Sequence, residues 1–182
     1  AAVLLARLAT PEHLGESDQN WIAMSQLAFK LGDKALANRL SESAMTRFQS
    51  VDAYAWSAQL ALDDENKALA RKRFAEALKR DPESLRLRTG YAALIAETGD
   101  YAGAAQALAK GEQTDVVYAA RAAYSARADN KVLLLALYQE IESDKGERTG
   151  KRLFLLGQIA ELAEKNAAAA RWYRRARPPS AP

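Results

Sequence analysis

The sequence predicts an all-α protein, a right-handed superhelical solenoid of antiparallel helix hairpins with about five repeats. The main observation is a recurring spacing of small and aromatic residues: Ala70, Phe74, Ala77 and Pro82, then Ala169, Tyr173 and Ala176. Related copies at Ala37 and Ala104 lie 33 and 34 residues from Ala70, and an interval of about 34 residues is typical of helical repeats. Composition agrees, because only 9 Gly and 5 Pro among 182 residues leave few helix breaks. No segment shows the apolar–polar alternation of a strand.

Each predicted repeat is a pair of helices separated by a short polar turn, and residues 1–176 are predicted to form one array. The expected units are residues 18–49, 51–82, 84–111, 116–141 and 151–176. Residues 1–10 are expected to form a partial preceding helix, and residues 12–19 a polar connection. The tail, residues 177–182, is expected to be disordered.

Turn and stop residues delimit the first three pairs. The first pair is expected at about 21–31 and 34–48, around Gly32-Asp33. The second, about 51–62 and 65–79, has an acidic turn without glycine, and Asp81-Pro82 ends it because proline cannot continue a helix. The third, about 84–98 and 101–110, turns at Gly99-Asp100, and Gly90 in its first helix permits close helix contact.

The last two pairs complete the prediction. The fourth, about 116–127 and 131–141, carries leucines where the other second helices carry alanine. A polar loop, 142–150, leads to the fifth, about 151–164 and 166–176. The alanines let antiparallel helices approach closely, and the aromatic fills the gap to the next hairpin. Each hairpin leaves an apolar face that a neighbour must cover, so at least about three are needed for stability.

These spacings resemble the tetratricopeptide repeat (TPR) family. That family has a large residue and Leu-Gly or Leu-Ala in its first helix, a turn glycine, then Ala, an aromatic and Ala in its second helix, often closed by Pro. Residues 151–176 carry the pattern at Leu153, Leu156-Gly157, Ala169, Tyr173 and Ala176. The resemblance implies a non-catalytic scaffold or adaptor that binds a partner protein or peptide in a concave groove lined by the first helices.

On the family's geometry, twelve side chains are expected to face that groove. They are Gln26, Lys30, Gln59, Asp63, Arg86, Thr89, Glu97, Tyr124, Arg127, Phe154, Gln158 and Glu161. Amides that bond a peptide backbone and two aromatic anchors suit an extended peptide or a partner helix; the alternative is that these are ordinary solvated residues. The carboxylate clamp of chaperone-binding members is not expected, since Gln26 and Gln59 stand where its Asn belongs.

A narrower resemblance is to TPR proteins of the bacterial envelope, including lipoproteins that act as adaptors of a carboxyl-terminal processing protease. It rests on residues 85–94, 153–161 and 171–174. It implies a periplasmic or outer-membrane-associated protein, although the absence of cysteine fits the cytosol equally. The chain does not begin with Met, so we expect a fragment or processed form. An alternative function is an assembly or self-association module that stacks through its terminal hairpins.

Composition and motifs argue against other classes. The net charge of +3 is too balanced for a nucleic-acid-binding protein, and no stretch is apolar enough for membrane insertion. His13 has no partner set for catalysis or a metal, and residues 146–152 lack the spacing of a phosphate loop. We therefore expect no enzyme activity, cofactor or metal. The basic runs at 71–80 and 171–177 are interpreted as solvated helix faces and helix-dipole effects.

Overall fold

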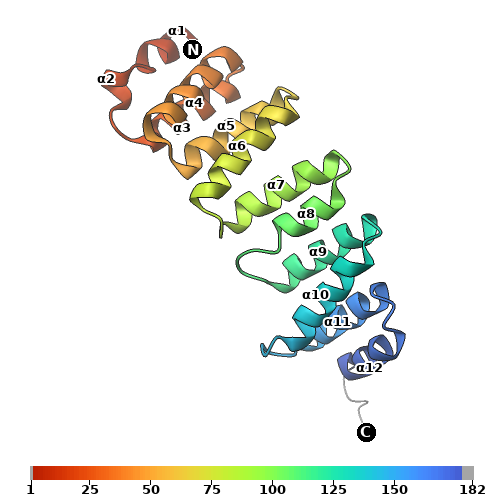
Figure 1. The fold of residues 1–182 in the computed structure, drawn as a ribbon. Coiled ribbons are helices and arrows are strands. Elements are labelled where there is room, and N and C mark those ends of the chain that lie inside the picture. The colour runs from red at the N-terminus through yellow and green to blue at the C-terminus, as the bar shows by residue number, and fades with distance from the viewer. Residues whose placement is uncertain (1, 178–182) are drawn as a thin grey trace. The chain divides into compact units, whose positions relative to one another are not determined.

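The computed structural model describes residues 2–177, and every regular element in that range is a helix (Figure 1). In chain order they are α1 (Ala2–Leu8), α2 (Pro11–Leu14), α3 (Asp18–Lys30), α4 (Lys34–Phe48), α5 (Val51–Asp63), α6 (Lys67–Arg80), α7 (Leu85–Glu97), α8 (Tyr101–Ala107), α9 (Asp115–Arg127), α10 (Lys131–Ser143), α11 (Gly150–Leu162) and α12 (Asn166–Ala176). The all-α helical-repeat class is confirmed. The predicted tail falls almost wholly on residues 178–182, which lie outside the described residues.

The chain forms two compact units, residues 1–91 (unit 1) and 92–182 (unit 2). In unit 1, α3 packs against α4, α5 packs against α6, and both α3 and α4 contact α5. In unit 2, α11 packs against α12 and also contacts α9 and α10, which pack together, while α8 contacts α9. The single array over residues 1–176 stays a prediction.

The hairpins share one register, set by the residues that begin their helices. Each first helix follows a hydroxyl residue, and each such residue precedes its hairpin's turn by the same number of positions: Ser17 to Gly32, Ser50 to Glu65, Ser84 to Gly99, Thr114 to Asp129, and Thr149 to Glu164. All five turn residues have a positive φ. A left-handed residue closes a helix readily, so each hairpin turns in the same way. In this role Glu65 replaces the glycine missing from the acidic turn.

In four of the five hairpins the side chain of the residue after the left-handed turn residue caps the second helix. Asp33, Asn66, Asp100 and Asn130 each accept a hydrogen bond from the backbone N–H three residues later, at 2.8–3.1 Å. Such a bond satisfies one of the N–H groups that a helix leaves unpaired at its start. Lys165, before α12, occupies the same position and makes no side-chain cap bond.

Replacing Lys165 with Asp is expected to stabilise α12 by about 1 kcal/mol, because a carboxylate supplies the missing cap and favours the positive end of the helix dipole. Amide hydrogen exchange of α12 measures the gain locally. Asn130→Ala is the matched control. It removes an existing cap of the same kind, so it is expected to lower the stability of α10 by a similar amount. Unchanged exchange in the Lys165→Asp variant would contradict the capping argument.

The helices differ from the sequence prediction in two regions: the predicted connection at 12–19, into which the start of α3 at Asp18 also extends, and the end of α8. The connection predicted at residues 12–19 contains the helical turn α2, which starts at Pro11, a residue preorganised for a first helical position. Helix α8 ends at Ala107 instead of continuing to residue 110. The Gln113 side-chain amide donates to the carbonyls of Leu108, Lys110 and Gly111, so these carbonyls bond to the loop instead of to a further helical turn.

Alanine, leucine, isoleucine and aromatic side chains form the core of each unit, and the alanines lie at positions of the repeat spacing. Ala28, Ala37 and Ala44 are fully buried between α3 and α4. In unit 2, Leu156 and Ile159 of α11 are equally buried. Buried alanines allow close backbone approach, which positions the first helix of each hairpin and therefore the surface that it presents.

Candidate functional site: two grooves on the helix hairpins

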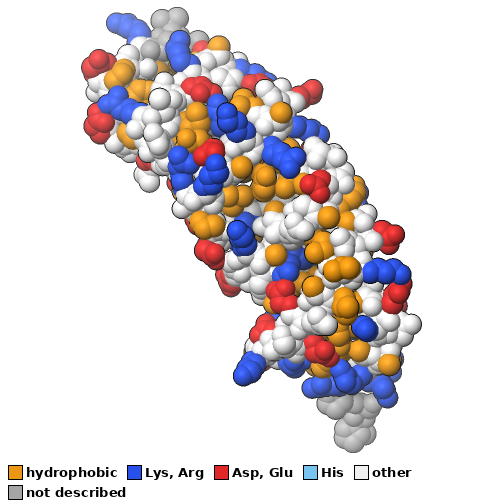
Figure 2. Space-filling model, viewed as in Figure 1, with side chains coloured by type: hydrophobic (Ala, Val, Ile, Leu, Met, Phe, Trp, Pro, Cys, Tyr) orange, Lys and Arg blue, Asp and Glu red, His pale blue; other side chains and the backbone are white. Residues whose placement is uncertain are grey.

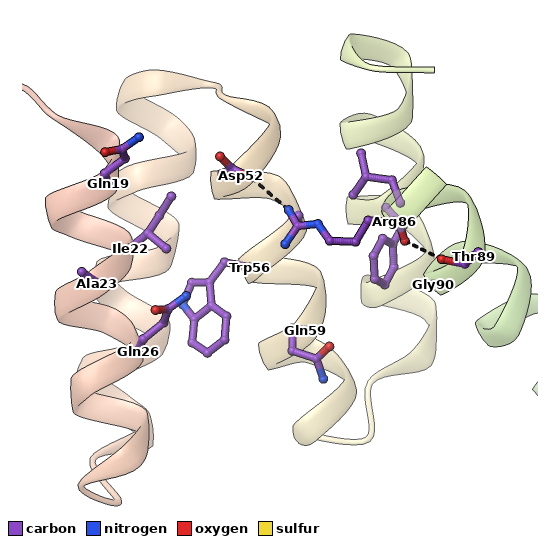
Figure 3. Close-up of a pocket in the computed structure, with 13 residues that line it drawn as sticks. Gln19, Ile22, Ala23, Gln26, Asp52, Trp56, Gln59, Arg86, Thr89 and Gly90 are labelled. Atoms are coloured by element: carbon purple, nitrogen blue, oxygen red, sulfur yellow. Dashed lines mark hydrogen bonds and ion pairs between the residues drawn. The ribbon is translucent and has the colours of Figure 1, made fainter. Parts of the chain in front are cut away.

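A groove of about 660 Å³ runs over α3, α5 and the start of α7 in unit 1 (Figure 3). Its side chains come from the same positions of three successive first helices: Gln19, Ile22, Ala23 and Gln26 of α3; Asp52, Ala55, Trp56 and Gln59 of α5; and Arg86, Thr89 and Gly90 of α7. Within α3 and α5 these positions are spaced i, i+3, i+4 and i+7, which is one face of a helix. We call this surface the glutamine groove.

Three exposed amides give the glutamine groove its hydrogen-bonding capacity. The side-chain amides of Gln19, Gln26 and Gln59 make no hydrogen bond to any residue that the structure describes. Each amide offers a carbonyl acceptor and two N–H donors. Amides on two neighbouring helices can therefore bond both the N–H and C=O groups of an extended backbone laid between them.

Trp56 forms the apolar wall between α3 and α5. Its indole N–H donates to the buried hydroxyl of Ser25 at 2.7 Å, and that hydroxyl donates to the Ala37 carbonyl at 2.6 Å. The ring also meets Phe29 edge-on, with centroids 6.1 Å apart. The hydrogen bond to Ser25 and the contact with Phe29 therefore fix the orientation of the indole, so Trp56 is a preorganised contact surface.

Phe74 and Gly90 form a second apolar part of the glutamine groove. A Cβ atom on Gly90 would lie 3.4 Å from two carbons of the Phe74 ring. The absence of a side chain at Gly90 therefore lets the α7 backbone pack directly on the Phe74 ring, which is largely buried. Beside it, Arg86 donates to Asp52 at 3.0 Å (Figure 3). Both side chains are exposed, so this ion pair contributes little stability and is available to a ligand.

A second groove, of about 680 Å³, lies between α11 and α12 in unit 2. Gly150, Lys151, Phe154, Tyr173, Ala176 and Arg177 line it, and we call it the aromatic groove. The Phe154 and Tyr173 rings pack at a centroid distance of 5.4 Å. Phe154 stays half exposed, and the lining contains two cations and no acid.

Tyr173 is held in place by its surroundings on α11. Its hydroxyl donates to Glu161 at 2.8 Å, and a Cβ atom on Gly157 would come within 2.5 Å of the ring. Burial, together with the hydrogen bond to the Glu161 carboxylate, raises the pKa of Tyr173 to about 12. The phenol therefore stays protonated at neutral pH and remains a hydrogen-bond donor. The sequence interpretation assigned Tyr173 to packing; Tyr173 is half-buried and packs against the core of unit 2, while the neighbouring Trp172 is the buried aromatic.

The structure brings together only part of the predicted concave set. Gln26, Gln59, Arg86 and Thr89 meet in the glutamine groove, and Phe154 lines the aromatic groove. Lys30, Asp63, Glu97, Tyr124, Arg127, Gln158 and Glu161 line neither. Arg127 instead donates to the Tyr101 hydroxyl at 2.6 Å and lies over that ring. A role of the predicted residues in binding stays a prediction.

The sequence interpretation missed Gln19, Asp52 and Trp56. The i, i+3, i+4, i+7 spacing from Gln19 to Gln26 and from Asp52 to Gln59 was the available signal. Phe74 and Gly90 were assigned to packing alone, and the structure shows that they also border the groove. Their place at the border of the groove depends on how α7 packs on α6, which no local pattern specifies.

Other candidate residues have structural partners. Arg73, assigned to a solvated face, is buried; it donates to Glu42 and Ser57. Arg171 pairs with Glu142, and Arg148, Arg171 and Arg175 lie over the Trp172 ring.

Among the described residues, no cluster of His, Cys, Asp and Glu fits a metal ion. No helix in residues 2–177 is long and apolar enough to cross a membrane.

No protein-family model and no curated protein sequence matches the chain. Several solved structures match its fold. The C-terminal part of a TPR repeat-containing protein from Cytophaga hutchinsonii matches with a TM-score of 0.63 and 12% identity, over 96% of this chain and 70% of the other. YrrB, described as a TPR protein with an unusual peptide-binding site, matches with a TM-score of 0.56 and 16% identity, over 97% of this chain and 92% of YrrB.

A third similar structure is Naa15/Naa10 bound to HypK, with a TM-score of 0.63 and 18% identity over 94% of this chain. The chain spans only 27% of that protein, and 64% of a TPR protein from Parabacteroides merdae. At these identities the matches show the fold alone. The fold is that of tetratricopeptide repeat proteins.

Proposed function

We propose that the protein is a non-catalytic interaction scaffold that binds an extended peptide segment of a partner in the glutamine groove. The observation that carries this proposal is the group of three unbonded glutamine amides around a fixed indole. Amides hydrogen-bond a peptide backbone whatever its sequence, and Trp56 accommodates one apolar side chain. The lining holds no His, Cys or Ser; its one hydroxyl, that of Thr89, donates to backbone carbonyls of α7, and Asp52 is paired with Arg86, so these residues are not arranged as a nucleophile and its base.

Two proteins with a similar fold support a binding role. YrrB is described with a peptide-binding site, and Naa15/Naa10 is bound to HypK. The narrower resemblance to envelope adaptors supports placing the scaffold in the bacterial envelope, as an adaptor that brings a protease to its substrates. The glutamine groove does not favour one cellular compartment over another, because recognition of a peptide backbone does not depend on compartment.

The test is selection of random twelve-residue peptides on the purified chain, followed by affinity measurement of those enriched. The double replacement of Gln26 and Gln59 by Ala is expected to lower the affinity for these peptides by about tenfold or more, since two hydrogen bonds are lost. Gln158→Ala is the matched control, because Gln158 is an exposed glutamine that lines neither groove. Enriched peptides that bind both variants equally, or no enrichment, would overturn the proposal.

A further inference from the structure

The aromatic groove is built from the same hairpin positions as the α5/α6 side of the glutamine groove. Counted from the residues that begin the first helices, Thr149 and Ser50, Lys151 corresponds to Asp52 and Phe154 to Ala55. Counted from the capping positions of the second helices, Lys165 and Asn66, Tyr173 corresponds to Phe74. Unit 1 therefore shows what such a surface accepts.

In unit 1 the occupant of this surface is a helix. Helix α7 approaches with Gly90 over the Phe74 ring and with Arg86 donating to Asp52 at 3.0 Å. Arg86 and Gly90 are four residues apart, so they lie on one face of α7. The α5/α6 surface thus recognises a helix with two features one turn apart. One is a charge opposite to that of residue 52, and the other is a residue small enough to pack on an aromatic ring.

The aromatic groove keeps this arrangement and reverses the charge. Lys151 stands at the position of Asp52 and has no acidic partner among the described residues, and Arg177 adds a second cation. Helix α12 carries three arginines and no acid. Figure 2 shows Lys and Arg side chains gathered over the α12 end of the molecule. Phe154 replaces Ala55 and enlarges the apolar wall beside Tyr173.

We infer that the aromatic groove seats an amphipathic helix of a partner protein, which presents an acidic residue to Lys151 and, one turn later, a glycine or alanine to the Phe154–Tyr173 pair. This surface is separate from the glutamine groove and shares no residue with it. The two sites can therefore be tested independently.

The probe is a labelled synthetic peptide with the α7 sequence, residues 85–97, in which Arg86 is replaced by Glu. It carries the acid and the glycine at the required spacing. The matched probe keeps Arg86. We expect the Glu peptide to bind the full chain about tenfold more tightly at low salt, because one probe attracts Lys151 and the other is repelled. The difference is expected to shrink as ionic strength rises.

Charge reversal on the protein completes the test. Lys151→Glu is expected to invert the preference between the two peptides, while Lys145→Glu, an exposed loop lysine outside the groove, leaves it unchanged. Phe154→Ala is expected to weaken the binding of both peptides, while the helical circular dichroism of the protein stays unchanged. Equal affinity of the two peptides, no binding of either, or a preference that survives in the Lys151→Glu variant would each overturn the inference. Light scattering that shows self-association through Phe154 would overturn it in favour of a second copy.

Discussion

Replacing Gly157 with Ala is expected to destabilise the α11/α12 hairpin by about 2 kcal/mol, although alanine is the better helix former. The added Cβ atom would lie 2.5 Å from two carbons of the Tyr173 ring. No Cβ atom tolerates that distance, so the ring or α12 must move. Overpacking of a core by one methyl group costs about 1–3 kcal/mol, which outweighs the gain in helix propensity of up to about 1 kcal/mol.

The Tyr173 ring has little freedom to move because three contacts hold it on α11. Phe154 packs beside it, Gly157 lies beneath it, and Glu161 accepts its hydroxyl at 2.8 Å. Any shift that relieves the clash loses the hydrogen bond or the ring contact. Amide hydrogen exchange of α11 and α12 measures the effect locally, which matters because a chain of two units need not unfold in one step.

Two controls separate the clash from a general effect of glycine replacement. Gly90→Ala places its Cβ atom 3.4 Å from the Phe74 ring, an ordinary contact, and is expected to be neutral or to stabilise α7 by up to about 1 kcal/mol. In a Tyr173→Ala background the cost of Gly157→Ala is expected to disappear, because the clashing ring is absent. A persistent cost there would refute the packing explanation.

Replacing Arg152 with Ala is expected to destabilise unit 2 by about 2–3 kcal/mol. Arg152 is largely buried; it donates to Asp115 at 2.9 Å and also to Asp144, and it lies over the Tyr118 ring. The guanidinium thus joins α9, the loop after α10, and α11. Its loss leaves two partly exposed carboxylates without a cation, and water compensates only in part.

Arg152→Lys and Arg86→Ala calibrate this prediction. Lysine keeps the charge but cannot donate to two carboxylates in a fixed fork, so an intermediate loss of about 1 kcal/mol is expected. Arg86→Ala breaks an exposed ion pair and is expected to cost less than about 0.5 kcal/mol. Denaturation of each variant and of the wild-type chain ranks the three losses in free energy of unfolding. If Arg152→Ala cost no more than Arg86→Ala, burial would not be the source of its contribution.

Much of the fold was predictable because its determinants are local. The alanine and aromatic spacing identified the hairpins, and Gly32, Gly99 and Asp81-Pro82 marked their limits. Turns were predicted at Glu65 and Asp129 as well, but the left-handed conformation of Glu65, Asp129 and Glu164 was not, since only a few per cent of non-glycine residues adopt a positive φ. Tertiary packing imposes that conformation once both helices of the hairpin are formed.

The amino-acid sequence was sufficient to establish an all-α repeat protein and to place Gln26, Gln59 and Arg86 on the surface that first helices present. It was not sufficient to separate binding positions from packing positions. Trp56 and Phe74 have the same residue types as core aromatics, and Lys151 resembles any solvated lysine. Whether such a side chain is covered depends on the helix that packs next to it: α7 covers the Phe74 ring with the backbone at Gly90, while the described residues leave Phe154 half exposed. Only three-dimensional contacts between hairpins contain that information, because burial is a property of neighbours and not of the residue itself.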